Sequence, residues 1–159
     1  MKYDDYEIRS IHFDEISVLE DFLYEAIYQP DRNNLVPKSI IEKPELQVYI
    51  KDFGKPDDNC LVAVCDEKTA GAVWTRLIKG YGFIDEETPE FAIALYSEYR
   101  GRGIGTNLMR EMLELLRSKG YKQTSLSVHK NNYALKMYKA VGFEVAREND
   151  HECFMIYKF

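Results

Sequence analysis

The chain has 159 residues, of which 45% are hydrophobic and 30% charged, and its formal net charge is −6. This size and composition indicate one globular domain and exclude a wholly disordered or fibrous chain. The negative charge disfavours nucleic acid and anionic membranes as partners, because binding phosphate requires clustered cations. We see neither an apolar run long enough to span a membrane nor a signal-peptide core, so we expect a cytoplasmic protein.

The cysteines and histidines are scattered along the chain. Cys60 and Cys65 flank a short apolar run, Cys153 lies near the far end, and neither CxxC nor HxxxH spacing occurs. We therefore expect small core cysteines in a reducing compartment and no metal site.

Hydrophobic periodicity predicts the elements of the first half in this order: a strand at 6–11, a helix at 14–28, a loop at 29–37, a helix at 43–54, and two strands at 60–65 and 72–78. The last of these strands contains Trp74, which we expect in the core, and Arg76, which we expect at the surface.

The elements predicted for the second half are an acidic loop at 79–90, a strand at 91–96, a helix at 104–118, a strand at 124–128, a helix at 131–142, and a hairpin of 143–147 and 153–159. The strand at 91–96 is almost entirely apolar, as expected when both of its faces are covered. Seven strands and four helices in this order predict a single domain over residues 1–159. Its class is mixed α/β (α+β), with a central sheet of about six to seven strands.

An unusual turn, Arg100-Gly101-Arg102-Gly103-Ile104-Gly105, separates the strand at 91–96 from the helix at 104–118, and Thr106 follows it. A helix start has free N–H groups and a positive dipole end, and glycines let an anion come close to them. The phosphate-loop and dinucleotide templates both fail here. The turn therefore predicts another kind of pyrophosphate ligand, or else a tight turn with two solvated arginines.

The same turn resembles the acyl-CoA signature of the GNAT N-acetyltransferase superfamily, [Q/R]-x-x-G-x-[G/A], at Arg100, Gly103 and Gly105. A second segment, NNYALKMYKAVGF, is similar to the family pattern Asn-x-x-Ala-x-x-Leu-Tyr-x-x-x-Gly-Phe, with Met137 where leucine is usual. The resemblance covers about residues 90 to 145 and departs at Ser97, where many members carry proline. Residues 1–80 agree with the family in element order only.

The resemblance implies acetyl-CoA, or another acyl-CoA, as donor and an amine as acceptor. It implies a splayed sheet in which the backbone of Ile93 and Leu95 binds pantetheine and the amides of 101–106 bind pyrophosphate. Arg100 and Arg102 would add positive charge, and Asn131 would bind CoA. The acceptor is left open between a small molecule and a protein amino group. The oligomeric state is also open, with a homodimer as one option.

Direct transfer in a ternary complex requires a neutral amine, yet a lysine-like amine is only about 0.04% neutral at pH 7. Glu90 is our first candidate for the general base, acting through water. Its alternative is a solvated carboxylate at the strand end, near other acidic residues. Tyr138 stands at the general-acid position that the resemblance implies, and its alternative is an aromatic core residue. For the whole chain, the alternatives are a non-catalytic acyl-CoA-binding module and a protein-interaction domain.

Overall fold

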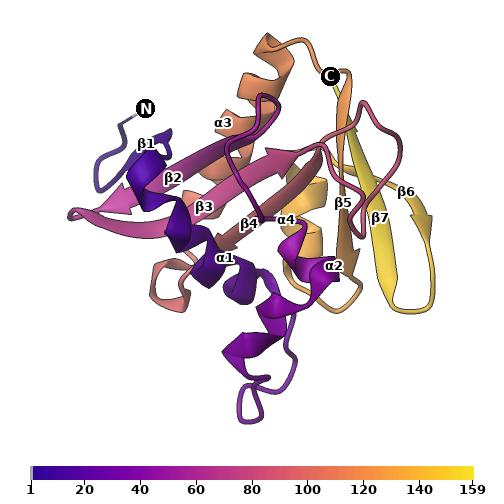
Figure 1. Cartoon of the computed structure of the whole chain (residues 1–159), viewed down its shortest axis with the longest axis horizontal. Helices are drawn as coiled ribbons and strands as arrows, with labels where there is room; N and C mark the ends of the chain where they lie inside the picture. The colour runs from indigo at the N-terminus through magenta and orange to yellow at the C-terminus, as the bar shows by residue number, and fades with distance from the viewer. Residues whose placement is uncertain (1) are drawn as a thin grey trace.

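The apolar and β-branched runs of the chain form one sheet in the computed structural model, which describes residues 2–159 (Figure 1). Its seven strands are β1 (Glu7–Ser10), β2 (Asn59–Cys65), β3 (Lys68–Arg76), β4 (Glu90–Leu95), β5 (Gln123–His129), β6 (Glu144–Glu148) and β7 (Glu152–Lys158). They lie in the order β1-β2-β3-β4-β5-β7-β6, and only β4 and β5 are parallel neighbours. The mixed class and the expected number of strands are confirmed.

Helices cover both faces of this sheet. They are α1 (Leu19–Ala26), α2 (Pro44–Gln47), α3 (Ile104–Ser118) and α4 (Ala134–Val141), with 3-10 turns at Phe13–Val18, Lys38–Glu42 and Ser97–Tyr99. In Figure 1, α1 and α2 lie in front of the sheet, and α3 and α4 lie behind it. Within residues 2–159, no helix has both the length and the apolar character needed to cross a bilayer.

Three of the predicted helices are shorter than their sequence patterns indicate. The helix predicted at 131–142 spans only Ala134–Val141. The helix predicted at 14–28 starts as a 3-10 turn and becomes α-helical only at Leu19. The helix predicted at 43–54 ends at Gln47, and turns follow in which Asp52 has a φ of 54°. The backbone carbonyls of those turns are bound by side chains of β3, so tertiary contacts replace helical hydrogen bonds there.

The core consists of two apolar layers, because alternate residues of the strands face opposite sides. One layer lies under α3 and α4 and includes Leu108, Met112 and Met155. The other lies under α1 and includes Phe22 and Trp74, of which Trp74 is 1% exposed, as predicted. All three cysteines are free and buried, which confirms them as core residues.

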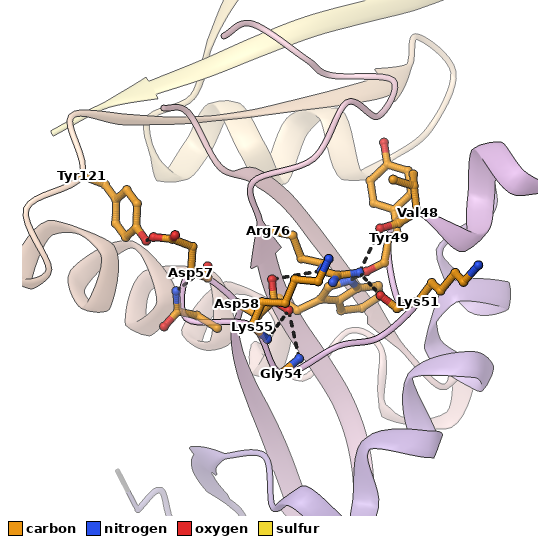
Figure 2. Close-up of polar contacts among 11 residues, drawn as sticks. Val48, Tyr49, Lys51, Gly54, Lys55, Asp57, Asp58, Arg76 and Tyr121 are labelled. Atoms are coloured by element: carbon orange, nitrogen blue, oxygen red, sulfur yellow. Dashed lines mark hydrogen bonds and ion pairs between the residues drawn. The ribbon is translucent and has the colours of Figure 1, made fainter. Parts of the chain in front are cut away.

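Arg76 is not at the surface, so our expectation for it is wrong. It ends β3 with only 3% of its area exposed. Its guanidinium forms an ion pair with Asp58, with 3.0 Å between Nε and Oδ1 (Figure 2). A buried arginine requires such a partner, because an unpaired charge in the interior is strongly disfavoured.

The sheet splays between β4 and β5. The two strands share one residue pair, Glu90 with Ser125, and the Ser125 amide donates to the Pro89 carbonyl at 3.1 Å. Backbone groups alternate in direction along a strand, so those of Ile93 and Leu95 also turn toward β5. Within the described residues β5 does not pair with them, and this edge of β4 opens onto a gap.

We expect Gly142→Ala to destabilise the fold by about 1–3 kcal/mol more than Gly54→Ala, because a new methyl group would overpack the core. Gly142 has a φ of 120°, and a Cβ there would lie 2.8 Å from a ring carbon of Tyr157. Gly54 has a similar φ of 129°, but a Cβ there would meet no atom within 4 Å. Urea unfolding of both variants measures the difference, and equal losses would show that backbone strain alone matters at Gly142.

Candidate active site

Glu90 is a buried carboxylate at the start of β4, with 2% of its area exposed. It accepts hydrogen bonds from the amides of Gly80 (2.6 Å) and Gly82 (2.8 Å) and from the Tyr49 hydroxyl (3.1 Å). Burial raises the pKa of Glu90, while the three hydrogen bonds favour its charged form and oppose that rise. The alternative of a solvated carboxylate is therefore excluded, and one of about four acceptor positions stays open for water.

Tyr138 lies on α4 and is 8% exposed, with its ring edge-on to that of Phe143 at 5.6 Å. Its hydroxyl makes no hydrogen bond with any residue of the described chain, 2–159. Over the same residues, every fully buried side-chain nitrogen or oxygen atom has a partner. The hydroxyl is thus not sealed in the core and faces open space, and burial of the ring raises the pKa of Tyr138.

The two candidate catalytic residues line the same cavity, of about 430 Å³. Its walls are largely apolar and aromatic and include Leu23, Leu46 and Trp74. A second cavity, of about 310 Å³, runs along the open edge of β4 past Leu95 and Arg100. Both cavities are lined by a shared set of residues, namely Ala26, Ile27, Tyr28, Ile93, Asn132 and Tyr138. Tyr138 therefore stands where the two cavities adjoin.

The glycines of the turn before α3 adopt backbone conformations that other residues avoid. Gly101 has a φ of 78° and Gly103, the N-cap of α3, a φ of 82°. A Cβ at either position would point into open space. The first amides of α3, at Ile104, Gly105 and Thr106, have no intrahelical partner because of their position. The turn thus offers open donors at the positive end of a helix of fifteen residues.

The two arginines of this turn are placed differently. Arg100 is half-buried, donates from Nε to the Leu95 carbonyl at 3.2 Å, and pairs with Glu25 at 3.4 Å. Arg102 is exposed and lies over the ring of Tyr99, 5.6 Å from its centroid. Arg100 therefore fixes the end of β4 against the turn, and Arg102 has the freer charge.

Asn131, which the resemblance implied as a CoA-binding residue, lines neither cavity, and its neighbour Asn132 does. Asn131 is exposed, and its amide donates to His129 Nδ1 at 3.0 Å. Asn132 lines both cavities, and its side-chain oxygen accepts the amide of Ala134, the first residue of α4, at 3.0 Å. The asparagine before α4 that meets both cavities is therefore Asn132, one residue after Asn131.

Sequence reasoning missed Tyr49 altogether. Its hydroxyl donates to Glu90 and accepts the Tyr81 amide at 2.8 Å, and the rings of Tyr49 and Tyr81 stack with centroids 6.3 Å apart. Tyr49 is one of twelve tyrosines and falls in a segment that carries no motif, so no local signal marked it.

The model of the acetyltransferase (GNAT) family matches residues 21–143. Spermidine N(1)-acetyltransferase of Escherichia coli strain K12 is 28% identical over 150 residues, which cover 86% of this chain and 74% of that protein. Mycothiol acetyltransferase of Corynebacterium glutamicum strain R is 34% identical over 77 residues, or 45% of this chain. The match spans only 26% of that mycothiol enzyme.

Solved structures share the fold. The PaiA N-acetyltransferase of Thermoplasma acidophilum, in complex with coenzyme A, has a TM-score of 0.71 at 22% identity, covering 97% of this chain and 99% of that one. A putative acetyltransferase of Acinetobacter baylyi ADP1 has a TM-score of 0.72 at 13% identity, and the match covers 97% of this chain and 93% of that one. At these identities the likeness concerns the fold.

Proposed function

The chain belongs to the acetyltransferase (GNAT) family, and from this premise we propose that it transfers an acetyl group from acetyl-CoA to a primary amine. The amine would attack the thioester directly in a ternary complex. The observation that carries this proposal is the junction of the two cavities, where Tyr138 lines both and Glu90 lines the larger one. A non-catalytic acyl-CoA-binding module would not need a buried carboxylate there.

The smaller cavity and the glycine turn fit acetyl-CoA. The backbone groups of Ile93 and the N–H of Leu95 face the gap, while the Leu95 carbonyl is already occupied by Arg100. The open amides after Gly103 and the charge of Arg102 suit a pyrophosphate. When bound, acetyl-CoA supplies a thioester carbonyl that a neutral amine can attack.

Converting the substrate ammonium into an amide removes two protons from nitrogen, one before and one after its attack, and the departing sulfur takes up one proton. Glu90 and Tyr138 would take part in these transfers. Glu90 would take a proton from the substrate ammonium through a water molecule, because its carboxylate is almost fully covered. Tyr138 would donate its hydroxyl proton to the departing thiolate, and the second proton that nitrogen loses would restore the phenol. Since a phenol has a pKa of about 10 and a thiol one of about 8.5, this donation must be concerted with bond cleavage.

The walls of the larger cavity favour an acceptor that is itself cationic. Three carboxylates line it, at Glu45, Glu90 and Glu152, against one lysine, Lys43. Aromatic rings of Tyr28, Tyr49 and Tyr81 add faces that attract ammonium groups. The similarity to a spermidine acetyltransferase agrees with this choice of substrate class.

A matched panel of small amines tests the proposal. With acetyl-CoA, we expect kcat/KM for 1,4-diaminobutane to exceed that for 4-aminobutanoate by at least about tenfold, because one substrate carries a second cation and the other an anion. Butylamine serves as the neutral-tail control, and thiol release measures turnover. Coenzyme A binding without turnover of any amine would instead establish the acyl-CoA-binding module.

A further inference from the structure

The segment that carries Tyr49 is held in place by two side chains of β3. The Nε1–H of Trp74 donates to the Tyr49 carbonyl at 3.1 Å. One guanidinium nitrogen of Arg76, Nη1, donates to the carbonyls of Val48 at 3.0 Å and Lys51 at 2.8 Å. Figure 2 shows both bonds running from the same guanidinium to one turn of chain. The backbone on either side of Tyr49 therefore has a fixed position.

Arg76 is itself fixed by a buried partner. The side chains of Arg76 and Asp58 are each 4% exposed, and Nε donates to Asp58 Oδ1 at 3.0 Å. The other carboxylate oxygen of Asp58 accepts the amides of Gly54 and Lys55, each at 2.9 Å (Figure 2). The guanidinium also lies over the ring of Phe53 at 5.4 Å. A planar guanidinium bound on several sides has one orientation, which a lysine would not reproduce.

The far end of this network is the carboxylate of Glu90. The Tyr49 hydroxyl accepts the Tyr81 amide, so its own proton is free to point at Glu90 Oε1. Burial and the charge of Glu90 raise the pKa of Tyr49, which keeps that proton in place. The hydroxyl thus stabilises the ionised form of Glu90.

We propose that Arg76 is a positioning residue for Glu90: with Asp58, it holds the turn at 48–51 so that the Tyr49 hydroxyl stays on the Glu90 carboxylate. The inference rests on the proposed function in one respect, which is that Glu90 acts as the general base. If the turn shifts, Glu90 keeps only the amides of Gly80 and Gly82, and its charged form becomes less stable.

The side chains paired with Glu90 in the sheet bind other partners and not its carboxylate. Its register partner on β3 is Arg76, whose hydrogen bonds go to Asp58 and to carbonyls, and its neighbour on β5 is Ser125, whose hydroxyl donates to the Gly82 carbonyl. Besides Tyr49 and Glu90, the titratable side chains that line the same cavity are Tyr28, Lys43, Glu45, Tyr81, His129, Tyr138, His151 and Glu152. Within residues 2–159, the titratable side chain bonded to Glu90 is Tyr49.

The test compares Tyr49→Phe, the charge-free double variant Asp58→Asn/Arg76→Met, and the triple variant that combines them. The pKa of Glu90 is followed by NMR of its carboxyl carbon, assigned with Glu90→Gln, beside the pH profile of kcat/KM. Removing a bond to the charged form raises the pKa of Glu90. A base works only when deprotonated, so the acidic limb moves to higher pH, and kcat/KM on that limb falls by about tenfold. The triple variant should show no further shift, because all three changes act through one hydroxyl.

Two further variants keep the test decisive. Arg76→Lys retains a positive charge beside Asp58 but loses the planar guanidinium that binds several acceptors at once. It should therefore also raise the pKa of Glu90, and it provides a test even if the double variant does not fold. Arg9→Lys is the matched control, because Arg9 on β1 also forms an ion pair with a carboxylate, that of Glu15. This variant should leave the pH profile of kcat/KM unchanged. If neither Arg76 variant changes the pKa of Glu90, the inference is overturned. If the pKa of Glu90 rises while the pH profile of kcat/KM stays the same, Glu90 is not the general base.

Discussion

Replacing Gly103 by valine is expected to weaken coenzyme A binding by about a hundredfold or more, which corresponds to about 2.7 kcal/mol. Gly103 caps α3 with a φ of 82°, a conformation that a β-branched residue strongly disfavours. A side chain at this position would also occupy open space at the start of α3, where an anion would have to approach. Both effects make the backbone N–H donors less available to a bound anion. Calorimetry with coenzyme A measures the resulting loss of affinity.

Gly120→Val is a matched control at the other end of the same helix. Gly120 has a φ of 86°, and a Cβ there also meets no atom within 4 Å. The two variants should therefore lose similar stability, of about 1–2 kcal/mol, from the left-handed backbone alone. Equal coenzyme A affinity in both would show that the turn before α3 does not hold the pyrophosphate.

Tyr138→Phe is expected to lower kcat by about a hundredfold to ten-thousandfold, which is the range for loss of a positioned general acid. The KM for acetyl-CoA should change little, because the ring that lines both cavities remains. Stability should also stay within about 0.5 kcal/mol, since the hydroxyl forms no hydrogen bond within the described chain. Steady-state kinetics and thermal unfolding together separate these effects.

Tyr157→Phe is the control for this change. The rings of Tyr138 and Tyr157 both lie edge-on to Phe143, at 5.6 Å and 5.5 Å, so each variant loses a hydroxyl from an equivalent packing position. We expect Tyr157→Phe to keep full activity. If Tyr138→Phe also did so, thiolate protonation would have to come from solvent, and Tyr138 would be only a wall of the cavities.

Much of the second half of the molecule could be predicted because its signals are local. The turn at 100–105 combines glycines with a long periodic helix, and the resemblance of 131–143 supplied the register of Tyr138. The strands also show either alternating polar and apolar residues or, where both faces of the sheet are covered, a continuous apolar run. These features depend on neighbours in sequence, and the structure contains them nearly where they were expected.

The acceptor side could not be predicted because its contacts join distant segments. Arg76 looked like a surface residue of the strand predicted at 72–78, and its partner Asp58 lies eighteen positions earlier. The turn at 48–51 was expected to be helical, yet Arg76 and Trp74 bind its carbonyls. Tyr49 meets Glu90 across forty-one positions, and no spacing rule connects them.

The single residue pair between β4 and β5 also divides the sheet into two units of strand pairing. Strands β1 to β4 come from one continuous stretch of chain, and β5 to β7 come from another, with α3 between them. Every other strand pairing lies inside one unit, so each can form its hydrogen-bonded ladder without waiting for the other. The core under α3 and α4 then joins the units on one face. The cavities therefore lie along the seam between these two groups of strands, where the sheet is joined by a single residue pair.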